Sequence, residues 1–159
     1  MKKHSLWIAI AAIAALILLM RLTLFHTVRI EGSSMENTLK SGDIALVSRL
    51  FGDPERFDIV ECRFPGRSDT YIKRVIGLPG EEIQLSGYSL CINGKTMLES
   101  YLSTPAEDFS VSLGPDEYLV LGDNRAESYD SRENDMGMLR REDFIGRVQF
   151  ILWPLRIPE

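Results

Sequence analysis

Residues 90–97 read Leu-Cys-Ile-Asn-Gly-Lys-Thr-Met, and this stretch decides the class of fold. Two short runs of strand-forming residues stand on either side of Asn93 and Gly94. An Asn-Gly pair readily adopts the positive φ angles of a type I′ turn, which is the tight connection of a β-hairpin. The pattern therefore predicts two antiparallel strands joined at Asn93 and Gly94.

Short strands separated by turns continue on both sides of this hairpin. Residues 104–115 fit no regular element, and we expect a loop there, away from any chemistry. Residues 140–144 fit one short helical turn, while the apolar or alternating runs predict strands at 28–30, 44–47, 57–64, 70–76, 82–85, 116–121 and 147–152. Many short strands with regular turns are typical of an all-β domain, with mainly antiparallel sheets in a barrel-like arrangement.

The beginning of the chain is different, because residues 6–20 are apolar and carry no charge. A helix from residue 6 to residue 25 would be about 30 Å long, the thickness of a hydrocarbon core. Lys2 and Lys3 precede this segment, which favours a cytoplasmic N-terminus. A cleaved secretory signal is the alternative, but residues 21–26 are bulky or charged where cleavage requires small side chains.

We therefore predict one transmembrane helix and a single-pass protein of the cell membrane. Residues 1–26 would form the cytoplasmic N-terminus and the anchor, and residues 27–159 an extracytoplasmic domain. Aromatic and apolar residues near the C-terminus would help this domain to rest on the lipid bilayer, namely Trp153, Leu155 and Ile157. Ordinary core packing is the alternative for these three.

Charge and cysteine content exclude several classes of function. Once the basic residues ahead of Glu31 are set aside, 14 basic residues stand against 23 acidic ones. Such an acidic domain is a poor binder of nucleic acid. Cys62 and Cys91 do not have the spacing of a zinc site, so we expect no metal. A disulfide between them and two buried free thiols both fit the pattern.

A polar stretch follows the apolar segment, and residues 31–39 read Glu-Gly-Ser-Ser-Met-Glu-Asn-Thr-Leu. A serine needs a base before it can act as a nucleophile. The two histidines, His4 and His26, lie in or beside the apolar segment, so we expect no Ser-His-Asp triad within the domain. The other common partner is a lysine whose pKa is lowered by burial, and Lys73 interrupts a run of strand-forming residues. A turn-capping serine and a solvated edge-strand lysine are the structural alternatives.

Three blocks make the chain similar to bacterial type I signal peptidases, the leader peptidase family with a Ser-Lys dyad. Ser34 stands directly before Met35, just past the predicted anchor. Residues 73–81 match the block Lys-Arg-Val-Ile-Gly-hydrophobic-Pro-Gly-Glu. The third block reads Gly-Asp-Asn-Arg at 122–125 and Ser-Tyr-Asp-Ser-Arg at 128–132. The resemblance covers nearly the whole chain.

This resemblance implies a membrane-anchored serine endopeptidase that cleaves N-terminal signal peptides from exported preproteins after small residues, through an acyl-enzyme. Ser34 would be the nucleophile, preferred over Ser33 because it directly precedes the methionine, and Lys73 would be the base. The backbone N–H of Ser34 would contribute to the oxyanion hole. Gly32 stands where some members place a second donor, so that donor remains open.

The resemblance also implies residues around the dyad. Five would orient the lysine or hold the site in shape: Ser128, Asp130, Arg132, Asp123 and Arg74. Five could line pockets for an extended substrate, with core packing as the alternative: Ile30, Met35, Leu39, Tyr71 and Ile72. No cofactor is implied, the partners are signal peptides and the lipid bilayer, and we expect a monomer.

Two other readings of the blocks need to be compared with this one. Self-cleaving repressors use a Ser-Lys dyad on a related fold, but they lack an anchor and carry a DNA-binding region. A membrane-tethered β domain that binds extended peptides without cleaving them is the alternative from another class. It predicts that neither Ser34 nor Lys73 matters for activity.

Overall fold

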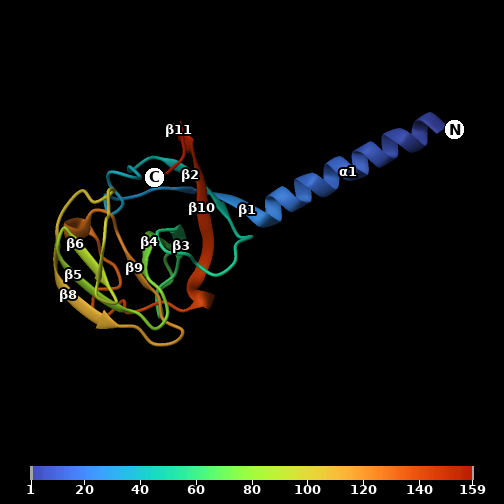
Figure 1. Ribbon diagram of the computed structural model, residues 1–159. Helices are drawn as coiled ribbons and strands as arrows, with labels where there is room; N and C mark the ends of the chain where they lie inside the picture. The colour runs from blue at the N-terminus through green and yellow to red at the C-terminus, as the bar shows by residue number, and fades with distance from the viewer. Residues whose placement is uncertain (1, 159) are drawn as a thin grey trace.

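One long helix and two β-sheets make up the chain, and the helix projects away from the sheets (Figure 1). The computed structural model describes residues 2–158, apart from the side chains of residues 2–6, 9 and 20–22. Helix α1 (Lys2–Leu24) leads directly into β1 (Phe25–Arg29), so the first strand begins two residues before the predicted domain start at residue 27. Within the described part of the chain, no helix has both the length and the apolar character of a membrane span.

The larger sheet has seven strands in the order β1-β2-β10-β3-β4-β9, and β11 pairs with β10. Every neighbouring pair is antiparallel, as predicted. Its other strands are β2 (Ile44–Ser48), β3 (Ile59–Cys62), β4 (Tyr71–Gly77), β9 (Leu119–Leu121), β10 (Phe144–Trp153) and β11 (Leu155–Arg156). Two 3₁₀ turns complete this part, η1 (Arg125–Glu127) and η2 (Arg141–Asp143), and η2 confirms the predicted helical turn.

The smaller sheet has the order β7-β6-β5-β8. Its strands are β5 (Glu82–Gly87), β6 (Ser89–Ile92), β7 (Lys95–Met97) and β8 (Ala106–Ser112). Between β6 and β7, Asn93 has φ 49° and Gly94 has φ 77°, which confirms the predicted Asn-Gly hairpin. Both cysteines are free thiols, with Cys62 buried and Cys91 half-buried.

The predicted loop at 104–115 is wrong, because β8 pairs with β5 along Ala106–Ser112. Phe109 and Val111 pack against a buried cluster, while the polar residues around them in β8 face solvent and hide the pattern. Nor is the segment remote from the third motif block. The Thr104 hydroxyl is 2.9 Å from Asn124 Oδ1 and forms a hydrogen bond with it.

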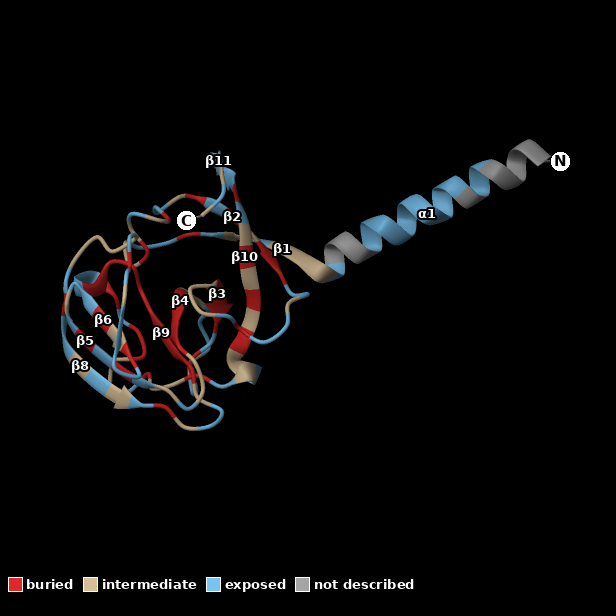
Figure 2. Cartoon of the chain, in the orientation of Figure 1, coloured by how far each residue is buried: buried red, intermediate tan, exposed pale blue. Residues whose placement is uncertain are grey.

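Strand β4 is covered on both faces, and this burial positions the candidate site (Figure 2). Val75 belongs to one hydrophobic cluster, and Ile76 belongs to another that joins the two sheets. Because side chains alternate along a strand, Lys73 and Arg74 point to opposite faces of β4. Both are buried. The motif block therefore places one basic side chain on each face of the strand.

Gly146 of β10 offers a test of the larger sheet. A Cβ at this position would lie 2.5 Å from Val47 Cγ1 and 2.7 Å from the Ser48 carbonyl oxygen. The second atom is backbone of the neighbouring strand β2, so the strands must move apart to admit a methyl group. We expect Gly146→Ala to lower the free energy of unfolding by about 1–3 kcal/mol.

Thermal unfolding of the purified protein in detergent measures this change. Gly52→Ala is the matched control, because no atom lies within 4 Å of its Cβ position. It should change stability by less than about 0.5 kcal/mol. Equal effects of the two substitutions would contradict the close contact between β10 and β2.

Candidate active site

Ser34 and Lys73 line one cavity of about 230 Å³. Ser34 lies in the loop between β1 and β2, and Lys73 lies on β4. Two segments form the cavity wall, residues 28–35 without Ser33, and residues 70–73. Ser33 instead accepts a hydrogen bond at its carbonyl oxygen from the Asn124 side chain, at 3.2 Å. Of the two adjacent serines, the structure therefore brings Ser34 to the lysine's cavity.

The side-chain nitrogen of Lys73 is buried away from solvent. The residue is 2% exposed, and its Nζ donates a hydrogen bond of 3.0 Å to Ser128 Oγ. Burial lowers the pKa of Lys73 below its ordinary value of 10.5, while the nearby Asp130 carboxylate acts in the opposite direction. The lowered pKa makes the neutral amine, which is the form that can accept a proton, easier to reach than in a solvated lysine.

The chain around Gly122 packs directly against the Ser34 loop. The Asn124 backbone N–H donates a 3.0 Å hydrogen bond to the Ser34 carbonyl oxygen. A Cβ on Gly122 would come closer than 3.0 Å to that oxygen and to the side chain of Ser128. Only glycine allows this approach. Sequence reasoning quoted Gly122 and Asn124 as part of a motif but gave them no role.

Asp130 and Arg132 hold the loop that carries Ser128. Arg132 Nε and Nη2 donate to the two carboxylate oxygens of Asp130 at 2.8 and 3.0 Å. Asp130 also accepts the Gly122 N–H at 3.0 Å, and Arg132 Nη2 reaches the Arg125 carbonyl oxygen at 2.7 Å. These bonds connect both halves of the third motif block.

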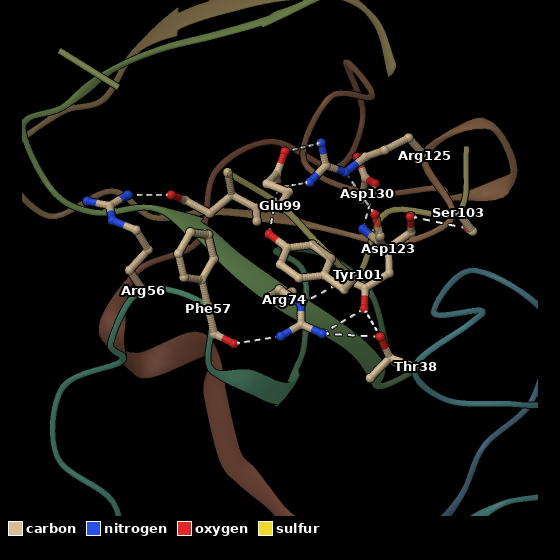
Figure 3. Close-up of polar contacts among 12 residues, drawn as sticks. Thr38, Arg56, Phe57, Arg74, Glu99, Tyr101, Ser103, Asp123, Arg125 and Asp130 are labelled. Carbon is tan, nitrogen blue, oxygen red and sulfur yellow. Dashed lines mark hydrogen bonds and ion pairs between the residues drawn. The ribbon is translucent and has the colours of Figure 1, made fainter. Parts of the chain in front are cut away.

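Arg74 and Asp123 form a second ion pair, which we call the Arg74 clamp, on the face of β4 opposite to Lys73 (Figure 3). Arg74 Nε and Nη2 donate to the two carboxylate oxygens of Asp123 at 2.9 and 2.7 Å. The Thr38 hydroxyl donates to Asp123 Oδ2 at 2.5 Å, which ties the end of the Ser34 loop to the clamp. Sequence reasoning missed Thr38, because nothing in its local pattern distinguishes it.

Four of the five predicted substrate-contacting residues line the cavity: Ile30, Met35, Tyr71 and Ile72. The structure places the fifth, Leu39, elsewhere. It is fully buried in the cluster beneath the cavity, where it packs with Ile30 and Met35. Gly32 lines the cavity with φ 85°, a backbone conformation that suits glycine.

The position of His26 differs from the expectation. It lies inside β1, which pairs with β2 along its whole length, so it belongs to the folded domain. Its Nε2 is 2.5 Å from Glu61 Oε2. Neither His26 nor any other described histidine lines the cavity that holds Ser34. The described lining of this cavity therefore offers Ser34 no histidine partner, whereas Lys73 does line it.

Comparison with known proteins assigns this arrangement to a family. The sequence model of "Signal peptidase, peptidase S26" matches residues 2–153. The chain belongs to this signal peptidase family. It is accordingly a serine endopeptidase that cleaves signal peptides from preproteins, as the three sequence blocks predicted.

Two relatives match nearly the whole chain in sequence, and one solved structure matches more than half of it. Signal peptidase I of Bacillus licheniformis is 39% identical over 171 residues, covering 96% of this chain and 91% of the relative. Signal peptidase I U of Bacillus subtilis (strain 168) is 37% identical, covering 92% and 86%. The crystal structure of a signal peptidase I from Enterococcus faecalis V583 superposes with a TM-score of 0.56 at 31% identity, over 61% of this chain and 97% of that chain.

Proposed function

We propose that this signal peptidase cleaves its substrates with a catalytic dyad of Ser34 and Lys73. The observation that carries the proposal is their shared cavity, in which a buried lysine with a lowered pKa and a loop serine line one wall. A neutral amine can remove the proton from a serine hydroxyl. The hydrogen bond from Lys73 to Ser128 fixes the position of that amine.

The reaction follows from these positions. Ser34 Oγ attacks the scissile carbonyl carbon and its proton passes to Lys73 Nζ. The oxyanion formed accepts a hydrogen bond from the Ser34 backbone N–H, the first donor of our proposed oxyanion hole. When the C–N bond breaks, Lys73 returns the proton to the leaving amine and the acyl group remains on Ser34. Lys73 then takes a proton from water, whose oxygen attacks the ester carbonyl carbon, and Lys73 returns that proton to Ser34 Oγ as the ester C–O bond breaks.

We propose that the substrate binds as an added strand along the unpaired edge of β4. Strand β9 pairs with β4 from Arg74 onward, while residues 71–73 pair with β3 on the other side. An extended peptide at this edge directs alternate side chains into the protein. Ile30, Met35, Tyr71 and Ile72 surround a cavity of about 230 Å³, which suits small side chains near the cleaved bond.

We further propose that α1 anchors the protein as a single span, with the chain up to Leu24 as cytoplasmic N-terminus and anchor and the domain from β1 onward outside the cytoplasm. In support, α1 has 23 residues, and its described apolar side chains from Trp7 to Leu19 are exposed. Lys2 and Lys3 at its start favour a cytoplasmic N-terminus. Trp153, Leu155 and Ile157 are also exposed, as a surface resting on lipid requires. We propose that the protein acts as a monomer.

The pH dependence of cleavage tests the proposed base. Lys73 must be neutral to act, so kcat/KM should rise with pH, by roughly tenfold per unit, until the lowered pKa of Lys73 is passed. The midpoint should lie below 10.5, the ordinary pKa of a lysine. The measurement is cleavage of a precursor with an Ala-x-Ala site by purified protein in detergent, from about pH 6 to pH 10.

Lys95→Met is the control, because Lys95 is exposed on β7 and should leave the profile unchanged. A rate that is independent of pH over this range would remove Lys73 from the role of base. Binding of the precursor without any cleavage would instead favour a tethered peptide-binding domain.

A further inference from the structure

A third buried ion pair connects Arg125 of the third motif block to Glu99, a residue outside the three blocks. Glu99 follows β7 and Arg125 begins η1, and their side chains are 0% and 1% exposed. Arg125 Nη1 donates to Glu99 Oε2 at 3.3 Å, and Arg125 Nη2 contacts Glu99 Oε1 (Figure 3). Glu99 is thus a fully buried carboxylate held by a two-pronged contact with one guanidinium.

Arg125 transmits this contact to the Ser34 loop. Its Nε donates a hydrogen bond of 3.0 Å to the Gly122 carbonyl oxygen. Gly122 in turn lies against the Ser34 carbonyl oxygen and the Ser128 side chain, closer than a Cβ would allow. A movement of the Arg125 guanidinium would therefore shift the Gly122 peptide, which packs against both Ser34 and Ser128.

Tyr101 transmits a second contact from Glu99 to the Arg74 clamp. Its hydroxyl donates to Glu99 Oε1 at 2.5 Å, and Arg74 Cζ lies 3.8 Å from the centre of its ring. Burial raises the pKa of Tyr101, so its phenol remains a proton donor. Arg74 holds Asp123 from this position. Glu99 therefore binds Arg125 directly and contacts Arg74 through the ring of Tyr101.

The rest of the segment after β7 also contacts the site loops. The Ser103 hydroxyl donates to the Glu36 carbonyl oxygen at 2.6 Å, and the Ser103 backbone N–H donates to that of Asp123 at 3.3 Å. Residues 99–103 thus lie across the back of the Ser34 loop and of the third block. A buried charge costs several kcal/mol of desolvation, so such an ion pair is a poor way to gain stability alone.

We propose that Glu99 is a positioning residue for catalysis. It acts through Arg125 and Tyr101 to hold Gly122 and Arg74, and through them the Ser34 carbonyl and Ser128. It lies outside the three motif blocks and connects the smaller sheet to the reacting groups. The inference rests on the proposed dyad for the identity of the groups that are positioned.

Steady-state cleavage of the Ala-x-Ala precursor by Glu99→Gln tests the inference. Glutamine keeps the size and one oxygen acceptor but removes the charge that fixes the guanidinium. We expect kcat to fall by about 10- to 100-fold, since small displacements of reacting groups have effects of this size. KM should stay within about twofold, because Glu99 does not line the substrate cavity. The acidic limb of the pH profile should stay in place, because Lys73 remains the base in this variant. If the proposed dyad failed, this limb would be missing from the parent as well.

Glu142→Gln is the matched control, since Glu142 is exposed on η2, and its kcat should be unchanged. Rates are normalised to the folded fraction measured by thermal unfolding. Tyr101→Phe keeps the ring under Arg74 and the Glu99–Arg125 pair, and it removes only one hydrogen bond. Its kcat should fall by about three- to tenfold. The inference is overturned if kcat per folded molecule is unchanged in both variants, or if only KM changes.

Discussion

Replacing Ser34 with alanine is expected to lower kcat for precursor cleavage by at least about four orders of magnitude, and Lys73→Met should have an equal effect. The first change removes the oxygen that attacks the carbonyl carbon. The second keeps an unbranched side chain in the buried site but removes the amine. Because the two groups act as a unit, the double variant should be no slower than either single variant.

Two substitutions outside the cavity serve as controls for this prediction. Ser33→Ala changes a side chain outside the cavity and leaves its backbone contact to Asn124 in place. Lys95→Met removes an exposed lysine. Both should retain activity within about twofold. Lys73→Met should unfold at no lower temperature than the parent, because a buried amine is unfavourable to desolvate. Substantial cleavage by Ser34→Ala, or losses that multiply in the double variant, would exclude the dyad.

Local patterns were sufficient to predict most of the fold. The Asn93-Gly94 turn requires positive φ angles, and the alternating runs around it can bury only one face, so antiparallel strands follow from both. Strand β8 escaped prediction because only three of its seven residues, Ala106, Phe109 and Val111, pack in the core, and they do so from an edge position. His26 was expected outside the domain because the apolar helix runs into β1 without a turn that would mark the boundary.

Some residues of the candidate site could likewise be predicted from the sequence, and others could not. Ser34 and Lys73 could be predicted because a nucleophile and a base are chemically distinctive and stand in motif blocks. Glu99 and Tyr101 have no such local signal, and their roles depend on contacts with Arg125 and Arg74 that only the tertiary structure creates. Leu39 and Met35 look equivalent in the sequence and both lie in the core, but only Met35 also reaches the cavity. Long-range packing decides such cases.

Gly122→Ala is expected to lower kcat by about 100-fold or more, although the residue carries no reactive group. The added methyl group would collide with the Ser34 carbonyl oxygen and with Ser128 Cβ and Oγ. The first is backbone of the nucleophile loop, and the others belong to the partner of Lys73. Relief of the collision therefore separates the two halves of the dyad, whichever atom moves.

The control for this change is Gly114→Ala, because a Cβ there would meet only the flexible side chain of Glu117. It should keep nearly full activity. Gly122→Ala should bind the uncleaved precursor with a KM close to that of the parent, since Gly122 does not line the cavity. A variant with normal kcat would show that Ser34 and Lys73 tolerate a wider separation than this packing allows. The inferred role of Glu99 in holding Gly122 would then lose its geometric basis, while the dyad itself would still be decided by the Ser34 and Lys73 variants.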